Sequence, residues 1–566
     1  MITAGLKFLS SEVRGLQSAV YVLATFAFLS SLLALLRDRL LAASFGAGAE
    51  LDLYYAAFRI PDFLFVALGA LVSVYMLIPE LARREEASQK SYIDTVVVGF
   101  SLLAALSGIV AALLAPKILS ALFPKFVEAG LLPTLTTLTR IMLLQPVLLG
   151  FSNIFAAITQ THYRYILYAA SPVFYNLGII LGVIVFYPVW GLPGLAWGVV
   201  LGAVLHAGIQ IPAIIKDGFF RRFPRLAEPR ALVRTISLSV PRALALSMNQ
   251  ITFIGLTALA GTLSAGSIAV FMFAYNLQAV PLAIIGASYS VAAFPTLAQS
   301  LSNGLRHEFI SHVATAARHV LFWSLPATAL IIVLRAHIVR VILGSGAFDW
   351  TDTRLTAAAF AIISLSLVCQ GILLLLVRGY YAAGRTFIPL LVSSAIALGT
   401  ISLGYALLAV FENPAVLPFL QVLLRVENTP GSHILALAFA YAFATIVGTG
   451  LLAALFERKF SGFLGAIKRT TAQSMVAAFS AGLAAYMTLY FLGPLSLSST
   501  LLSVFIRGFS AGIIGIAAAA IAYSLLKNPE YIQTAGALRA KLWKGAVKSE
   551  SGVTLVASAE ESTELK

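Results

Sequence analysis

The sequence predicts an all-α polytopic membrane protein with about 14 transmembrane helices. Its 566 residues are 60% hydrophobic and only 11% charged, and the mean hydropathy is +0.94. This composition excludes an ordinary soluble domain, which carries about 25% charged residues. Apolar runs of about 20 residues, enough for a helix to cross the bilayer core, recur along the chain.

Charged or turn-forming residues separate these runs and define the expected spans. The first run follows Lys7 and Arg14, but no convincing cleavage site comes after it, so we interpret it as a retained helix and not a signal peptide. The expected spans lie near residues 19–36, 52–78, 95–115, 133–159, 166–187, 192–215, 235–260, 267–295, 312–334, 353–377, 387–411, 434–456, 470–492 and 499–526.

A basic segment divides the expected helices into two groups. Six Lys and Arg residues lie between residues 216 and 234, where no apolar run occurs. The expected domains are an N-terminal six-helix lobe (1–215), a basic cytoplasmic connector (216–234), a second six-helix lobe (235–456), helices 13 and 14 (457–526) and a cytoplasmic tail (527–566).

The distribution of Lys and Arg predicts that both termini are cytoplasmic. With the spans above, that orientation places 25 of the 38 Lys and Arg residues on the inner side, 7 on the outer side and 6 within spans. Positive residues concentrate in cytoplasmic loops, so the count favours this topology.

An internal repeat is indicated between the two groups. Tyr55 and Pro61 are echoed by Tyr275 and Pro281, each 220 residues later. A repeat unit with an even number of spans keeps its orientation, so we expect six helices plus six helices in parallel repeat.

Proline and glycine predict where helices bend and where they pack closely. Proline inside a helix removes a hydrogen bond and tends to kink the helix; the prolines within spans are Pro61, Pro146, Pro172, Pro212, Pro241, Pro281 and Pro326. Glycines four residues apart give flat faces for helix packing, as at Gly178 and Gly182 and at Gly194, Gly198 and Gly202.

The sequence lacks the motifs of several classes of function. The net charge of +15 is typical of cytoplasmic loops that face anionic lipid, so no nucleic-acid partner is expected. Cys369 is the only cysteine, the seven histidines lack zinc spacing, and there is no phosphate-cradling Walker loop. We expect no cofactor and leave a coupling ion open.

Charged residues inside spans are the candidate site. Arg59 and Asp62 flank Pro61 in an apolar run, and an unneutralised charge at the bilayer centre costs about 2.5–3.5 kcal/mol or more, so such groups normally face a cavity or a partner. The excess of cations indicates an anionic ligand such as phosphate, although arginines near helix ends also reach the interface. Further arginines at similar depth are Arg140, Arg242 and Arg507.

Five segments resemble the MurJ (MviN) family of lipid II flippases. They read RDRLLAASFGAGAELDLYYAAFRIPDF, IPELARRE, YRYILYAASPVFYNLGII, FAYNLQAVPLAIIGASYSVAAFPTLA and RGYYAAGRTFIPLL, and they are spread along the chain, so that the resemblance spans most of residues 20–395. The resemblance implies the fourteen-helix fold of the multidrug/oligosaccharidyl-lipid/polysaccharide exporter superfamily. It also implies a cationic cavity between two lobes and a groove for a polyprenyl tail at helices 13 and 14.

The resemblance assigns roles to single residues. Arg37 matches a cavity arginine of the family, Asp52 a functional aspartate, and Arg59 a basic cavity position. The chain departs from the family pattern at Ser30-Ser31, where many members have Ser-Arg, and at Phe65-Val66, where a basic pair is common. It also has Asn276 at a usual arginine position, so either Arg140, Arg242 and Arg507 compensate or the head group differs.

The function that the resemblance implies is transport of lipid II, a polyprenyl-pyrophosphate-linked sugar-peptide, across the bacterial cytoplasmic membrane by alternating access, without catalysis. The expected substrate-binding residues are Arg37, Arg59, Asp52, Asp62, Asn276, Arg140 and Arg242. Asp52 and Asp62 are also the first carboxylates to test for a coupling ion. Two alternatives stay open, namely an exporter of another polyprenyl-linked glycan or a drug, and a membrane glycosyltransferase that uses Glu128, Asp349 or Asp352. Oligomeric state is open.

Overall fold

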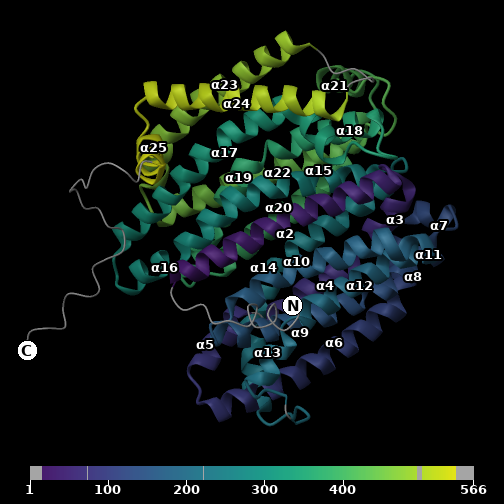
Figure 1. Ribbon diagram of the computed structural model, residues 1–566, viewed down its shortest axis with the longest axis vertical. Coiled ribbons are helices and arrows are strands. Elements are labelled where there is room, and N and C mark those ends of the chain that lie inside the picture. The colour runs from purple at the N-terminus through teal and green to yellow at the C-terminus, as the bar shows by residue number, and fades with distance from the viewer. Residues whose placement is uncertain (1–15, 73, 221, 494–499, 543–566) are drawn as a thin grey trace, which may run out of the picture.

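A computed structural model describes residues 16–72, 74–220, 222–493 and 500–542, and every element in these ranges is a helix (Figure 1). In chain order the helices are α2 (Leu16–Phe45), α3 (Ala49–Ala57), α4 (Arg59–Leu71), α5 (Val74–Ala82), α6 (Glu86–Leu122), α7 (Pro124–Glu128), α8 (Leu132–Met142), α9 (Leu144–Thr161), α10 (Tyr165–Leu181), the π-helix η1 (Gly182–Phe186), α11 (Tyr187–Trp190), α12 (Leu192–Gly208), α13 (Ile211–Lys216), α14 (Pro229–Gly261), α15 (Ser267–Pro281), the π-helix η2 (Leu282–Ala287), α16 (Ser288–Ser302), α17 (Arg306–Leu343), α18 (Trp350–Ser364), α19 (Leu367–Ala382), α20 (Phe387–Phe411), α21 (Val416–Leu424), α22 (Ile434–Lys459), α23 (Phe463–Leu492), α24 (Leu501–Leu525) and α25 (Pro529–Leu542).

The predicted all-α polytopic fold is confirmed. Within the described ranges, 12 helices are long and apolar enough to cross a membrane, and α18 and α19 form a further candidate bent by 43°. Each of them overlaps one predicted span. The first predicted span falls on α2, a 30-residue helix that is not among these candidates, so the count of 14 stays a prediction.

Prolines mark three of the breaks within spans. The turn at Phe58 separates α3 from α4 three residues before Pro61, and the turn at Leu143 separates α8 from α9 three residues before Pro146. A proline ring hinders the carbonyl one turn earlier and offers no N–H, so the helix is interrupted on its N-terminal side. Pro212 follows the break between α12 and α13 in the same way.

The predicted glycine faces pack backbone against backbone. A Cβ added at Gly178 of α10 would lie 2.2 Å from the Cα of Gly202 of α12, and one added at Gly182 would lie 2.6 Å from the Cα of Gly198. These glycines therefore allow α10 and α12 to approach more closely than any larger side chain permits.

Gly178→Val is expected to destabilise the protein by about 3 kcal/mol or more, because the clash is with backbone that no side-chain rotation can relieve. Thermal unfolding of the purified protein in detergent measures the effect. Gly208→Val in α12 is the matched control, since a Cβ there meets nothing within 4 Å. Equal unfolding temperatures for the two variants would contradict this packing account.

We call the part of the chain before the connector (216–234) the N-terminal half and the part after it the C-terminal half. The bundle has two ends that differ in how these halves meet. We call the end that holds Ala47, Gly266 and Gly346 the seam end, and the end that holds Arg84, Asp217 and Lys459 the connector end. In Figure 1 the purple and blue N-terminal helices occupy the lower part, the green and yellow C-terminal helices occupy the upper part, and α2 runs between them.

One large apolar cluster joins the halves at the seam end. It includes Leu41, Leu135, Phe253, Phe273 and Phe360, which come from helices on both sides of the connector. Most members of the next two clusters come from one half, although the connector segment contributes Phe219 and Ala231 to the second. The first contains Phe309, Tyr380 and Phe456, and the second contains Tyr92, Phe100 and Ile158. The buried core is therefore shared at the seam end and divided toward the connector end.

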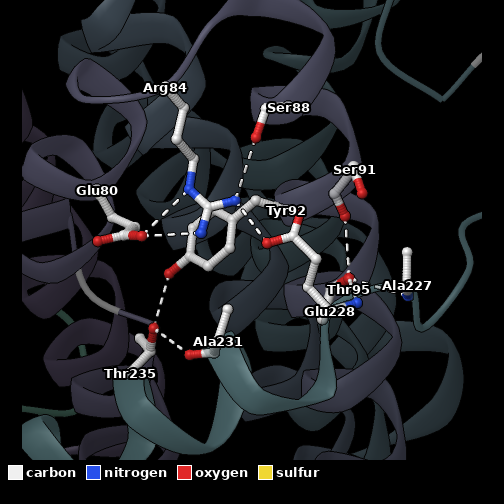
Figure 2. Close-up of polar contacts among 10 residues, drawn as sticks. All are labelled: Glu80, Arg84, Ser88, Ser91, Tyr92, Thr95, Ala227, Glu228, Ala231 and Thr235. Atoms are coloured by element: carbon white, nitrogen blue, oxygen red, sulfur yellow. Dashed lines mark hydrogen bonds and ion pairs between the residues drawn. The ribbon is translucent and has the colours of Figure 1, made fainter.

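The connector is attached to the N-terminal half by a polar cluster (Figure 2). Arg84 donates to Glu80 at 2.9 Å and to Glu228 at 2.6 Å, and its guanidinium lies over the Tyr92 ring with its central carbon 4.3 Å from the centroid. The Tyr92 hydroxyl lies 2.8 Å from the Thr235 hydroxyl on α14. Burial alone would lower the pKa of Arg84, but the hydrogen bonds to Glu228 and Glu80 outweigh it and raise that pKa.

Arg84 and Glu228 are expected to be energetically coupled by about 1.5–3 kcal/mol, the range for hydrogen bonds that involve charged groups. The side chains are only 16% and 28% exposed, which limits screening by solvent. A double-mutant cycle of Arg84→Gln and Glu228→Gln, followed by thermal unfolding, measures the coupling. Additive effects of the two substitutions would show that the pair does not hold the connector.

Candidate functional site

A buried polar hub joins α2, α10 and α15. Arg37 of α2 donates from Nε and Nη2 to Oδ1 of Asp38 at 2.9 and 2.8 Å, and from Nη1 to Oδ1 of Asn176 at 3.2 Å. Asn276 of α15 donates to the other carboxylate oxygen of Asp38 at 3.1 Å. The Asp38 carboxylate therefore bridges an arginine of the N-terminal half and an amide of the C-terminal half.

Asp38 is the candidate site residue that sequence reasoning missed. It lies next to Arg37 and Arg39, so the three charges read as the polar end of a span. In the structure Asp38 is only 3% exposed. The available signal was a carboxylate adjacent to a candidate arginine, because a buried charge needs a partner.

Arg59 and Asp62 lie together one turn apart on α4. Arg59 is 4% exposed, donates from Nε to the Tyr55 carbonyl at 3.1 Å, and has Nη2 3.9 Å from Oδ2 of Asp62. Its guanidinium also faces the Phe253 ring of α14 at 5.9 Å. The Asp62 side chain is 28% exposed, so the carboxylate is the more accessible member of the pair.

Asp52 caps a helix of the other half. Its Oδ2 accepts from the backbone N–H of Gly266 at 2.6 Å and its Oδ1 from that of Ala269 at 2.8 Å, at the N-terminus of α15. A carboxylate at this position satisfies free N–H groups and favours the positive end of the helix dipole. Gly266 has φ +88, and a Cβ there would lie 1.9 Å from the Ala47 carbonyl oxygen, so the approach needs glycine.

Further hydrogen bonds continue this contact and form what we call the seam. All of them join the segment from residue 39 to residue 52 with the C-terminal half, and several use backbone atoms. They run from Arg39 Nη1 to the carbonyls of Val341 and Ile342 at 2.7 and 3.1 Å, from Ala347 N to Ala43 O at 2.8 Å, and from Ala47 N to Asp352 Oδ2 at 3.1 Å.

The other candidate arginines lie elsewhere or are not described. Arg140 is exposed and donates to the Ala112 carbonyl at 3.0 Å. Arg507 donates to the Gly493 carbonyl at 3.3 Å. The side chain of Arg242 lies outside the described part of the structure. The structure therefore brings together Arg37 with Asn276, and Arg59 with Asp62, but does not place Arg140 or Arg507 with either pair.

A cavity of about 500 Å³ lies between the halves and is lined by apolar side chains together with uncharged polar ones. Phe65 and Val66, which stand where the family commonly has a basic pair, are part of its wall. No charged side chain is among the described residues that line it, so Arg37 and Arg59 are not part of its wall in this conformation. The polar lining residues are Asn153, Asn249, Gln250, Thr252, Tyr275, Gln370, Tyr381, Ser393, Tyr441 and Thr445.

The described residues include no group of three His, Cys, Asp or Glu side chains that could hold a metal ion. Of the two carboxylates considered for a coupling ion, Asp52 is 3% exposed and uses both oxygens on α15, whereas the Asp62 side chain is 28% exposed.

Comparisons with known proteins agree on the family. The family model described as lipid II flippase MurJ matches residues 41–506. A probable lipid II flippase MurJ of Buchnera aphidicola subsp. Acyrthosiphon pisum is 27% identical over 376 residues, covering 64% of this chain and 72% of the relative. A probable lipid II flippase MurJ of Thermotoga maritima is 26% identical over 452 residues, covering 78% of this chain and 90% of the relative.

Solved structures share the fold. One described as lipid II flippase MurJ in an inward closed conformation has a TM-score of 0.70 and 20% sequence identity, covering 90% of this chain and all of that chain. An inward-facing multidrug resistance MATE family transporter of the MOP superfamily has a TM-score of 0.59 and 16% identity, covering 78% and 95%. Because the family model matches most of the sequence and the fold agrees, the chain belongs to the MurJ family of lipid II flippases.

Proposed function

We propose that this protein moves lipid II from the cytoplasmic to the outer leaflet of the bacterial cytoplasmic membrane by alternating access. The observation that carries the proposal is the hub of Arg37, Asp38 and Asn276, which places a cation between the two halves of a flippase-family chain. A charge held by residues from both halves can couple ligand binding to their relative movement.

The proposed orientation places the connector end in the cytoplasm, with both termini on that side. The concentration of Lys and Arg in the loops of that end supports this orientation. The seam end then faces outward and is closed by the shared apolar cluster and the seam, while the core is divided toward the cytoplasm. We infer that this conformation is closed on the outer side and that the transport cycle opens it there.

In the proposed mechanism the pyrophosphate of lipid II displaces Asp38 from Arg37, whose side chain is 20% exposed. Guanidinium groups bind phosphate oxygens in bidentate geometry, and loss of the Asp38 bond also weakens the link to Asn276. The two lobes then rock, the seam opens, and the head group reaches the outer side. The polyprenyl tail stays in lipid beside helices 13 and 14, which are α23 and α24.

The membrane potential supplies a driving force for this step. An inside-negative potential favours outward movement of negative charge by about 2.3 kcal/mol per charge per 100 mV. Asp62 is the first carboxylate to test for ion coupling, because both oxygens of Asp52 already accept hydrogen bonds from the N-terminus of α15.

A second candidate is export of another polyprenyl-linked glycan. The neutral lining of the cavity and Asn276 at a usual arginine position favour it, because fewer cations suit a head group that carries less negative charge than lipid II.

Rescue of a bacterium depleted of its own lipid II flippase tests the proposal. Membrane insertion is confirmed by surface labelling, and externally accessible lipid II is scored with cell lysis. Restored accessibility is the expected result. Correctly inserted protein that leaves lipid II inside would contradict lipid II transport and favour the other glycan.

A further inference from the structure

A second cavity, of about 1040 Å³, lies at the seam end between α17, α18, α21 and α23. It is lined by a different set of residues from the cavity between the halves, and no part of the proposed lipid II mechanism uses it. Its basic lining residues are Arg335 of α17, Arg354 of α18 and Arg425, which directly follows α21.

The lining carries positive charge that the described residues only partly neutralise. No carboxylate is among the lining residues; the single carboxylate paired with them is Glu427, 3.4 Å from Arg354. Arg335 donates only to main-chain carbonyls, those of Ile332 at 2.9 Å and Leu424 at 3.3 Å. Arg335 and Arg425 both line the cavity, so two like charges face the same space, and an anion there would neutralise them.

His337 adds a buried polar group without a partner. It lines the cavity, is 8% exposed, and neither of its ring nitrogens forms a hydrogen bond to the described residues. Both nitrogens are shielded from the cavity as well, so His337 contributes its ring to the wall and not a hydrogen-bonding group to a ligand.

Apolar and aromatic side chains form the opposite wall. Tyr486, Leu489 and Tyr490 project from the last two turns of α23, which ends at Leu492, and Tyr490 is 73% exposed. Tyrosines near the end of a transmembrane helix lie at the level of the lipid head groups. The cavity therefore meets lipid on one side and arginines on the other.

We propose that this cavity binds the phosphate group of an anionic membrane lipid, with the acyl chains against the α23 wall. Arg335 and Arg425 contact the phosphate oxygens, because guanidinium groups match phosphate geometry and are readily desolvated. With the connector end in the cytoplasm, the bound lipid belongs to the outer leaflet. The site requires only the fold and the membrane, so it does not depend on lipid II as the transported ligand.

Titration of the purified full-length protein with short-chain phosphatidylglycerol, followed by native mass spectrometry, tests the site. Phosphatidylcholine, which carries a phosphate but no net charge, tests whether the site needs an anionic lipid. Inorganic phosphate and glycerol phosphate test whether a soluble anion binds as well as a lipid does. The test variant is Arg335→Gln with Arg425→Gln. The matched control is Arg222→Gln with Arg225→Gln, which removes two exposed charges from the connector.

The test variant is expected to bind phosphatidylglycerol about tenfold more weakly or worse, since two charge-assisted contacts are lost, while the connector variant binds as the parent does. Equal binding by test variant and parent, or equal affinity for phosphatidylcholine, overturns the proposal. Inorganic phosphate that competes as well as the lipid shows a soluble-anion site instead. If the double variant fails to fold, phosphatidylglycerol binding by Arg425→Gln alone tests the proposal. This single variant is expected to fold, because the Arg425 side chain is exposed and donates no described hydrogen bond.

Discussion

Arg37→Ala is expected to abolish rescue of flippase-depleted cells. The substitution removes the proposed pyrophosphate ligand and leaves Asp38, which is 3% exposed, without its cation. Removing one member of a buried ion pair costs about 3–5 kcal/mol, so loss of stability and loss of ligand binding both contribute. Cell survival and externally accessible lipid II are measured at matched protein abundance in the membrane.

A second variant separates these two contributions. Arg37→Ala with Asp38→Ala removes both charges, so the thermal stability lost in the single variant is expected to return while transport stays absent. Arg140→Ala is the control, because Arg140 is exposed and its described hydrogen bond is to a single backbone carbonyl. Transport by the double variant would show that the Arg37–Asp38 pair is structural and that the pyrophosphate binds elsewhere.

The fold was predictable because the bilayer imposes strong rules on sequence. Apolar runs bounded by charged turns located the 12 spans and the bent pair, and prolines located the breaks before Pro61, Pro146 and Pro212. Glycine spacing likewise predicted close-packing faces on α10 and α12, but not that these two faces pack against each other. These features depend on local composition and on helical periodicity, which a sequence shows directly.

The site was less predictable, because its geometry depends on contacts between distant segments. Asp52 caps α15 from more than 200 residues away in sequence, and no local pattern distinguishes such a carboxylate from one that faces a cavity. Burial of Asp38 was hidden for the same reason, because its partner Asn276 lies on α15. Arg59 was identified because an arginine inside an apolar run needs a partner wherever it lies.

Cross-linking of the seam is expected to stop transport completely. Ala43 and Ala347 belong to different halves, and the Ala347 N–H donates to the Ala43 carbonyl at 2.8 Å, so cysteines at both positions lie within reach of a short linker. Cys369 is the only native cysteine, and Cys369→Ala provides a background without other thiols. In that background Ala43→Cys with Ala347→Cys is treated with a reducible bis-methanethiosulfonate reagent, and lipid II transport is followed in vesicles before and after reduction.

The physical reason is that outward opening must separate these two residues, whereas the closed seam keeps them together, so a covalent link removes the outward-facing state from the ensemble. Glu50→Cys with Tyr187→Cys is the matched control. Those side chains also meet near the seam end, at 3.1 Å between the Tyr187 hydroxyl and Glu50, but both belong to the N-terminal half. The control pair should cross-link without loss of transport, and reduction should restore transport in the seam pair. If the cross-linked seam pair still transports lipid II, the seam does not open during the cycle, and the head group must leave by a lateral route between helices.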